Sequence, residues 1–335
     1  MKIDIFNHVF PRKFFDRHIL GGPGKGIVKR MANATVGVDL DHRFRILDEF
    51  GDVRQVITLG QPPIETLAGP EESEAVAREA NDGLAELVSQ HPDRFLAFAA
   101  SLPLNNVDAS IRETERATVQ LGAKGVMIYT NVGGKPLDAP EFQPLFDEFA
   151  RRDVLVWMHP ARSATMADYS AETMSAYEIW WALGWPYETS AAMARLVFSG
   201  TFDRHPNLRI ITHHMGGLVP YLEGRIGYGW DQLGVRTSHV DYSGVLGSLK
   251  KRPLDYFHQF YADTALFGAS GATRCGLEFF GADRVLFASD MPFDPTPGLY
   301  MRETIRVIEG LGLSADDKQR IYSGNAERLL GTASG

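Results

Sequence analysis

The chain has 335 residues, of which 44% are hydrophobic and 23% charged, enough to bury a large core and within the normal size of one α/β barrel. Its 34 basic and 42 acidic residues give a net charge of -8 with no basic block, which argues against a nucleic-acid partner. No apolar run is long enough to span a membrane and the N-terminus does not read as a signal peptide, so we expect a soluble, cytoplasmic protein without a membrane partner.

Short β-branched segments alternate with amphipathic segments of helical spacing along the whole chain. The strand-like segments are KIDIFNHVF, VRQVITLG, FLAFAASLP, AKGVMIYTN, VLVWMHP, LRIITHHMGG, FHQFYADTAL and VLFASDMPF. Eight strands alternating with helices predict an α/β protein made of one (β/α)8 TIM-like barrel over residues 1–335. Its chemistry is expected at the carboxyl ends of the strands.

Two connections are too long to be simple turns. Residues 12–42 follow the first strand and contain GGPGKG, and residues 161–190 follow the fifth strand and contain YEIWWALGWPY. Because long loops on the active face of a barrel usually shape or cover a pocket, we predict that both are lid-like. The last segment, ADDKQRIYSGNAERLLG, predicts a helical closure over the barrel.

Three ionisable residues follow strands that barrel closure brings toward one point. His8, His159 and Asp290 end the first, fifth and eighth strand-like segments. Each histidine alone could be a buried side chain satisfied by a backbone partner. Two nitrogens and a carboxylate oxygen together suit zinc or manganese, with water in an open position, so the set predicts a divalent metal site.

The sixth strand ends in THHMGG, which offers two adjacent histidines. Strand alternation lets only one of them face the barrel, and the following glycines favour His214 at the mouth, which predicts that His213 packs outward. A tight turn with a buried histidine is the alternative. Asp263 in YADTAL is predicted to orient neighbouring groups, and Cys275, the single cysteine, is not expected to act as a nucleophile.

The segment at 177–187 is rich in aromatic side chains. Trp180, Trp181 and Trp185 could be core or lid residues, or a flat pocket wall for a conjugated substrate. Arg225, in LVPYLEGRIGYGW, taken singly is a surface arginine.

Several segments together resemble a known group, the amidohydrolase superfamily, and within it the relatives of aminocarboxymuconate-semialdehyde decarboxylase and γ-resorcylate decarboxylase. They are IDIFNHVFP, WMHP, GWPYETSAAMARLVFSGTFDRHPNLRIITHHMGG, RVLFASDMPF and IYSGNAERLL. The resemblance implies an amidohydrolase-type barrel in which His8, His159 and Asp290 bind zinc or manganese and His214 is the catalytic histidine. It does not specify a reaction, because relatives include decarboxylases, hydrolases and hydratases.

The resemblance also implies residues that bind the substrate. Arg225, eleven residues beyond His214, would reach a neighbouring subunit's site and hold a substrate carboxylate, which implies a homodimer or a higher homo-oligomer. Trp181 matches an aromatic residue near the substrate. For the substrate arginine in the loop after the first strand, Arg30 and Arg43 are the candidates; the alternative for Arg43 is that it starts the next helix.

Phe6 departs from the pattern that the resemblance implies. It stands where such relatives carry the first histidine of an H-x-H pair, or in some resorcylate-type relatives a glutamate, and phenylalanine cannot bind a metal. Asn7 lies on the opposite face of the strand and is no obvious substitute. Three protein ligands and water still suffice for a catalytic zinc, so we expect a metal to bind with lowered affinity.

Three hypotheses of function follow. The first is a metal-dependent, non-oxidative decarboxylase of a carboxylated aromatic or muconate-like small molecule, with Asp290 or His214 supplying the proton that replaces carbon dioxide. The second is a hydrolase of a lactone, amide or carbon–carbon bond, in which His214 and Asp290 activate water, with or without a metal. The third is a barrel that only binds a small molecule. Carbon dioxide release, against ring opening or water uptake, separates the first two.

Overall fold

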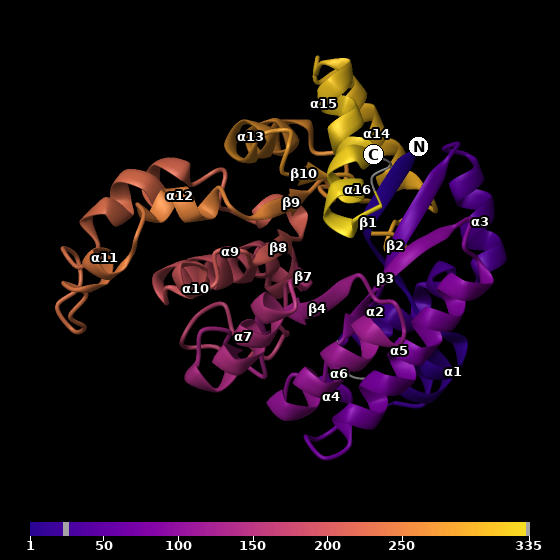
Figure 1. Cartoon of the computed structure of the whole chain (residues 1–335), viewed down its shortest axis with the longest axis horizontal. Coiled ribbons are helices and arrows are strands. Elements are labelled where there is room, and N and C mark those ends of the chain that lie inside the picture. The colour runs from indigo at the N-terminus through magenta and orange to yellow at the C-terminus, as the bar shows by residue number, and fades with distance from the viewer. Residues whose placement is uncertain (23–26, 333–335) are drawn as a thin grey trace.

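A computed structural model describes residues 1–22 and 27–332 of the chain (Figure 1). Its centre is an 8-stranded sheet in the order β1-β2-β3-β4-β7-β8-β9-β10, in which neighbouring strands are parallel. The strands are β1 (Lys2–Val9), β2 (Val53–Leu59), β3 (Phe95–Ser101), β4 (Gly125–Tyr129), β7 (Leu155–His159), β8 (Arg209–Thr212), β9 (Tyr261–Asp263) and β10 (Val285–Leu286). Each lies within one of the predicted segments, so the prediction of eight alternating strands is confirmed. A two-stranded hairpin, β5 (Asn131–Val132) with β6 (Lys135–Pro136), lies apart from this sheet.

Backbone hydrogen bonds join the chain after β10 to β1. The amide of His8 donates to the carbonyl of Met291 at 2.7 Å, and the amide of Asp290 donates to the carbonyl of Phe6 at 3.1 Å. The first and last strands therefore meet, and the sheet closes into the predicted TIM-type barrel. This closure places Asp290 beside His8, although the two residues lie at opposite ends of the sequence.

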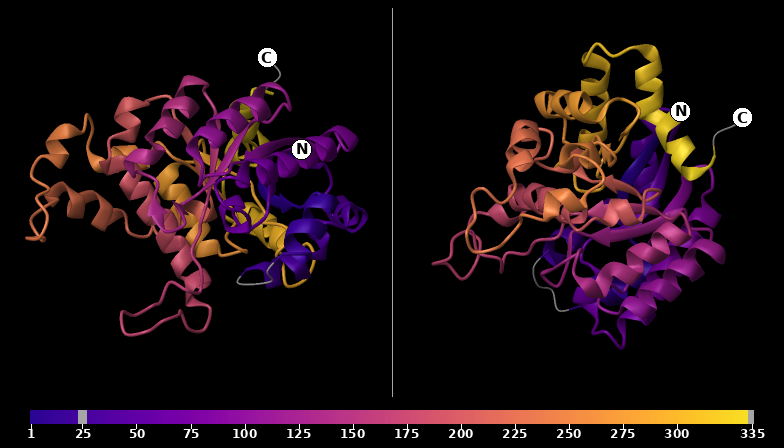
Figure 2. Two further views of the ribbon diagram at one scale, coloured as in Figure 1. Left: turned by 90° about the horizontal axis from the view of Figure 1, so that it is seen from below. Right: turned by 60° about the vertical axis from the view of Figure 1, so that its left-hand side comes forward.

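Helices surround the barrel, as Figures 1 and 2 show. They are α1 (Arg12–Phe14), α2 (Val28–Asn33), α3 (Leu40–Asp48), α4 (Ile64–Leu67), α5 (Ser73–Gln90), α6 (Val107–Val119), α7 (Gln143–Arg151), α8 (Ile179–Ala182), α9 (Gly184–Phe198), α10 (Thr201–Arg204), α11 (Val245–Ser248), α12 (Pro253–Phe257), α13 (Ser270–Phe280), α14 (Leu299–Gly310), α15 (Ala315–Gln319) and α16 (Asn325–Leu330). Among the described helices, none has the length and hydropathy needed to cross a bilayer.

Helix α5 illustrates how the sequence builds the outer layer. Val76, Ala80 and Leu84 recur at helical spacing and are all buried, whereas the charged residues between them lie toward solvent. An apolar stripe of this kind must pack on another element, and α5 lies against β2 and β3.

The two predicted lid-like segments contain more helix than the sequence suggested. Residues 12–42 form α1, η1 (Phe15–Leu20), α2, η2 (Thr35–Gly37) and the start of α3, while positions 23–26 of GGPGKG lie outside the described residues. Residues 161–178 are irregular, and the aromatic stretch that follows forms α8 and the start of α9. Proline at an early position of α9 is compatible with a helix because that residue needs no amide donor there.

The segment that carries α11 and α12 extends from the barrel and projects at the left of Figure 1. The C-terminal segment instead lies against the barrel: it forms α15, η7 (Arg320–Gly324) and α16, and the carbonyl of Ile321 accepts the amide of Phe287 at 2.9 Å. The helical prediction for this segment is confirmed.

Candidate active site

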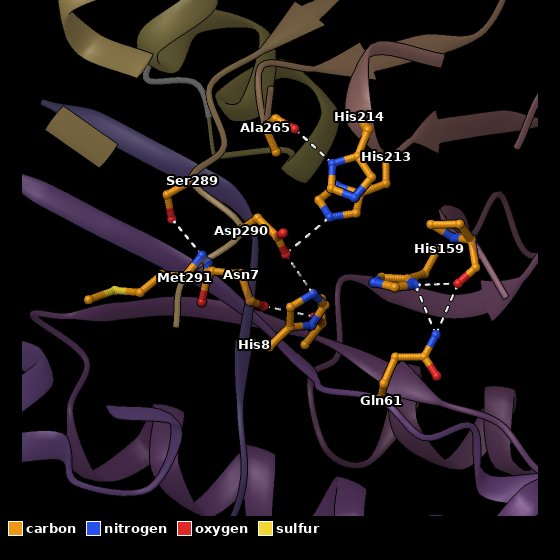
Figure 3. Close-up of polar contacts among 12 residues, drawn as sticks. Asn7, His8, Gln61, His159, His213, His214, Ala265, Ser289, Asp290 and Met291 are labelled. Carbon is orange, nitrogen blue, oxygen red and sulfur yellow. Dashed lines mark hydrogen bonds and ion pairs between the residues drawn. The ribbon is translucent and has the colours of Figure 1, made fainter. Parts of the chain in front are cut away.

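Five ionisable side chains from four parts of the barrel converge at the carboxyl ends of its strands (Figure 3). His8 lies near the end of β1, His159 ends β7, His213 and His214 follow β8, and Asp290 follows β10. All but His214 are buried, and His8 and His213 are 0% exposed. Barrel closure thus brings together the residues that the sequence singled out, and adds His213.

The donor atoms of this cluster lie at distances suited to one small cation. The Nε2 atoms of His8 and His213 each lie 3.3 Å from Asp290 Oδ1. One ring nitrogen from each of His8, His159 and His213 lies within 4.8 Å of the other two, and the same holds for donor atoms of His213, His214 and Asp290. Such a set of nitrogens and one carboxylate oxygen can hold zinc or manganese.

The prediction that His213 packs outward is wrong. Its ring is fully buried in the cluster and stacks on His214, with ring centroids 3.7 Å apart. The alternation rule fails here because β8 ends at Thr212 and the backbone then enters a left-handed turn at His214, where φ is 53°. Adjacent side chains at such a turn need not point to opposite faces, so both histidines reach the site.

The Nδ1 atom of every histidine in the cluster lies next to an oxygen that can only accept a hydrogen bond. The contacts are His8 with Leu59 O at 3.2 Å, His159 with Pro160 O at 2.7 Å, His213 with Asp263 Oδ2 at 2.5 Å and His214 with Ala265 O at 2.7 Å. Thr58 Oγ1 and Gln61 Nε2 also lie near His8 Nδ1 and His159 Nδ1, but they donate to the carbonyls of Asn7 and Pro160. In the neutral form of each ring, Nδ1 therefore carries the proton and Nε2 keeps its lone pair. This tautomer is the one that metal-binding histidines adopt when a second residue orients them.

Burial keeps three of the histidines uncharged. It lowers the pKa of His8; burial and the neighbouring His213 lower the pKa of His159 well below its ordinary value and that of His214 to about 4. Burial alone would raise the pKa of Asp290, but the neighbouring rings of His213 and His8, each with Nε2 3.3 Å from Oδ1, lower it well below its usual range. Neutral imidazoles and an ionised carboxylate are the protonation states that bind a divalent cation.

His213 has the opposite electrostatic environment. Burial alone would lower its pKa, but the carboxylates of Asp263 and Asp290 on its two ring nitrogens raise that pKa to about 9. The position between these two carboxylates therefore favours a positive charge, which either a proton on His213 or a bound cation can supply.

One buried atom tests whether the residues present fit a metal. Within the described part of the chain, His8 Nε2 is buried and has no hydrogen-bond partner, although Asp290 Oδ1 lies 3.3 Å away. A buried nitrogen without a partner costs stability unless something binds it. A cation among these lone pairs would satisfy it, so the donor set fits a divalent metal.

A cavity of about 440 Å³ opens onto His159 and Asp290. Its aromatic lining consists of Trp180, Trp181, Trp185, Phe267, Phe293 and Tyr300. Lys29 and Arg30, both exposed, line it as well. The volume lies within the range of pockets that enclose small ligands. The three tryptophans therefore do lie at a pocket, with Trp181 39% exposed.

Arg43 was expected to contact a substrate, but it does not line this cavity. Its side chain is 0% exposed because α3 directs it under β1. There it donates to Asn7 Oδ1 at 2.6 Å, to Gln55 Oε1 at 2.8 Å and to the carbonyl of His8 at 2.9 Å. This burial corrects the prediction: Arg43 supports the strand that carries His8, and Arg30 is the arginine at the cavity.

We expect Arg43→Ala to lower the free energy of unfolding by about 3–5 kcal/mol, because it leaves several buried polar groups without their partner. Arg45→Ala, on the exposed face of the same helix, is the matched control and should change stability by less than about 0.5 kcal/mol. Urea unfolding of both variants measures the difference. Equal stability of the two variants would contradict a supporting role for Arg43.

Sequence reasoning missed the residues that fix the loop of Asp290. Asp4 Oδ2 accepts hydrogen bonds from Ser289 Oγ at 2.6 Å and from Gln55 Nε2 at 2.8 Å, all buried. Ser289 Oγ in turn accepts the amide of Met291 at 3.1 Å. The one available signal was an aspartate inside the otherwise apolar run IDIF.

Two other predicted residues lie outside the cluster. Arg225, in η5 (Arg225–Gly229), is exposed and does not line the cavity, so its predicted role in a neighbouring subunit stays a prediction. Asp263 does orient a neighbour, because it accepts the Nδ1 proton of His213.

Comparison with known proteins agrees with this geometry. Residues 4–332 match the amidohydrolase family. The chain is 33% identical over 303 residues to a gamma-resorcylate decarboxylase of Rhizobium sp. (strain MTP-10005), covering 87% of this chain and 86% of that protein. It is 31% identical over 264 residues to a 2-amino-3-carboxymuconate-6-semialdehyde decarboxylase of Dictyostelium discoideum, covering 79% of this chain and 68% of that protein.

Among solved structures, the chain is similar to a dihydroxybenzoic acid decarboxylase from Polaromonas sp. JS666 with bound manganese and the inhibitor 2-nitroresorcinol. The TM-score is 0.78 and the identity 26%, covering 100% of this chain and 98% of that one. Fold, site and sequence thus point to the same group, and the chain belongs to the amidohydrolase family.

Proposed function

We propose that the protein is a metal-dependent, non-oxidative decarboxylase of a carboxylated aromatic small molecule. The observation that carries the proposal is the aromatic-walled cavity, which has cations at Lys29 and Arg30 and opens onto His159 and Asp290. The relatives named above, which act on carboxylated aromatic or muconate compounds by their names, support the same reaction.

The cavity suits a planar, negatively charged substrate. The ring centroids of Trp180 and Trp181 lie 5.9 Å and 6.4 Å from that of Trp185, at interplanar angles of 70° and 71°. The three rings therefore offer both flat and edge-on apolar surfaces to an aromatic ring. Lys29 and Arg30 supply positive charge for a carboxylate. Trp185 also contacts His159, with ring centroids 5.4 Å apart, so a ring held by the tryptophans lies next to the histidine cluster.

His8, His159 and Asp290 would hold the divalent metal. When bound, zinc or manganese supplies Lewis-acid stabilisation for the negative charge of a substrate carboxylate and a neighbouring oxygen. The protein fixes these ligands in advance: Leu59 O and Pro160 O accept the Nδ1 protons of the two histidines.

Decarboxylation leaves a carbon that must receive a proton, and Asp290 or His214 supplies it. Asp290 is ionised at pH 7, because its pKa lies well below its ordinary range. His214 is neutral at pH 7, because its pKa is lowered to about 4. Each must therefore first take the proton from the substrate or from water. His214 can do so through Nε2, since its Nδ1 donates to Ala265 O at 2.7 Å.

The test is carbon dioxide release. We expect the zinc- or manganese-loaded protein to release one carbon dioxide per molecule of a hydroxylated aromatic acid such as gamma-resorcylate, with incorporation of one solvent deuteron at the ring carbon in D2O. Substrate loss without carbon dioxide, with uptake of the elements of water, would instead favour a hydrolase.

We propose further that Arg225 completes the site of a second copy. Its exposed position outside its own cavity supports this role. Arg225→Ala should then raise KM about 10-fold or more with little change in unfolding, because a charged contact to a carboxylate contributes about 1.5–3 kcal/mol. Arg274→Ala, an exposed arginine of α13, is the control. A protein that sediments as a monomer and is fully active would reject this role.

A further inference from the structure

We propose that His213 is itself a ligand of the divalent ion, together with His8, His159 and Asp290, and that Asp263 is the residue that positions it. This inference rests on the proposed metal-dependent function and changes its ligand set: the site gains a third nitrogen from the turn after β8.

The distances around Asp290 support a shared ion. Asp290 Oδ1 lies 3.3 Å from His8 Nε2 and 3.3 Å from His213 Nε2. Both separations exceed the roughly 2.7–2.9 Å of a strong charged hydrogen bond. They match the roughly 3.3 Å edge of a tetrahedron whose metal–ligand bonds are about 2.0 Å long. The same oxygen can therefore share one ion with both nitrogens.

Asp263 gives His213 the second partner that metal-binding histidines have. Its Oδ2 accepts the Nδ1 proton of His213 at 2.5 Å, while its Oδ1 accepts the amides of His214 and Ala265, both at 3.0 Å. The carboxylate is 0% exposed and held at both oxygens, so it fixes the tautomer and the ring orientation. Nε2 of His213 is left facing the cluster.

Two aromatic rings hold the imidazole of His213 in place. Phe6 stacks on the His213 ring with centroids 4.0 Å apart and an interplanar angle of 21°. His214 also stacks on the His213 ring, with centroids 3.7 Å apart and an interplanar angle of 29°. Phe6 also lies 5.8 Å from the ring of His8 and 5.9 Å from that of His159. Phe6 cannot bind a metal, but its ring packs on that of His213, which can provide an additional nitrogen.

Ring orientation separates His213 from its neighbour His214. The ring of His8 stands at 85° to His213 and at 68° to His159, and the centroids of the His159 and His213 rings lie 5.1 Å apart, too far for stacking. His214 instead stacks on His213 with centroids 3.7 Å apart, and rings stacked this closely do not readily direct two lone pairs at one ion. His214 is therefore left as the acid–base residue, and His213 as the ligand.

Zinc titration of the metal-free protein against a chromophoric chelator tests this assignment without any substrate. We expect His213→Gln to weaken zinc binding by at least about 100-fold, and Asp263→Asn by roughly 10–100-fold. His214→Gln, the same substitution at the adjacent residue, should keep the wild-type zinc affinity. Wild-type affinity in His213→Gln, or an equal loss in His214→Gln, would overturn the proposal.

A second measurement needs no variant that disturbs folding. In the Co²⁺-loaded wild-type protein, each histidine bound through Nε2 with a protonated Nδ1 gives one exchangeable, strongly shifted proton resonance. We expect three such resonances, and all three should persist in His214→Gln. Two resonances would overturn the proposal. Three resonances in a protein that releases no carbon dioxide would leave this ligand set standing and reject the proposed function.

Discussion

Asp290→Ala is expected to remove decarboxylation and metal binding together. Asp290 provides the one carboxylate oxygen that lies 3.3 Å from both His8 Nε2 and His213 Nε2, and it is a candidate for the proton transfer. Proton transfer alone contributes about 10²–10⁴-fold to rates of this kind. Loss of the metal as well should bring the fall in kcat/KM above about 10⁴-fold.

The experiment pairs steady-state carbon dioxide release with zinc titration of the same preparation. Asp283→Ala is the control, because this exposed aspartate precedes β10 at the other end of the strand. It should keep both properties, since chemistry is expected at the carboxyl end of the barrel. Asp290→Ala with wild-type zinc affinity would remove Asp290 from the ligand set; wild-type turnover would also exclude it from the proton transfer.

The sequence predicted the barrel well because its signal is periodic. β-branched runs and amphipathic helices recur along the chain, and their order alone places His8, His159 and Asp290 at the same end of the barrel. Barrel closure then follows from hydrogen bonds between β1 and the chain after β10, which no local pattern encodes. The predicted cluster depended on fold-level topology more than on any single motif.

The sequence failed where side-chain direction depends on the local backbone. His213 was predicted to point outward from strand alternation, but β8 ends one residue earlier and His214 has a left-handed φ of 53°. Arg43 was a candidate for the substrate arginine that the resemblance implies, but it lies in α3, the alternative given for it, and points under β1. Neither direction can be inferred from spacing, because each depends on where a regular element ends or begins.

Phe6 shows how tertiary contacts alter the meaning of a substitution. From sequence it removes a ligand, since phenylalanine has no donor atom. In the fold its ring packs against His213 with centroids 4.0 Å apart, next to a histidine that the strand pattern had directed away from the site. Whether the lost donor lowers metal affinity thus depends on a residue more than 200 positions away in the chain.

Removal of the metal is the second change with a large expected effect. Dialysis against a chelator should abolish carbon dioxide release, and addition of Zn²⁺ or Mn²⁺ should restore it, because neutral His8 and His159 and ionised Asp290 are in the protonation states that bind a divalent cation. Mg²⁺ is the control, since it favours oxygen ligands and should restore little activity.

The same preparations report on binding independently of turnover. A ligand at 1,000 times its Kd stabilises the folded state by about 4.1 kcal/mol, so saturating Zn²⁺ should raise the Tm of the chelated wild-type protein. His159→Ala should lose both this shift and the restored activity, because it removes a buried donor nitrogen at the floor of the cavity. If the chelated protein instead keeps full activity and shows no shift with either ion, the metal part of the proposal is wrong. The ionised Asp290 and the neutral His214, which lie in one cluster with His213, would then have to move the proton by themselves, and Phe6 would mark a barrel that works by metal-free acid–base chemistry.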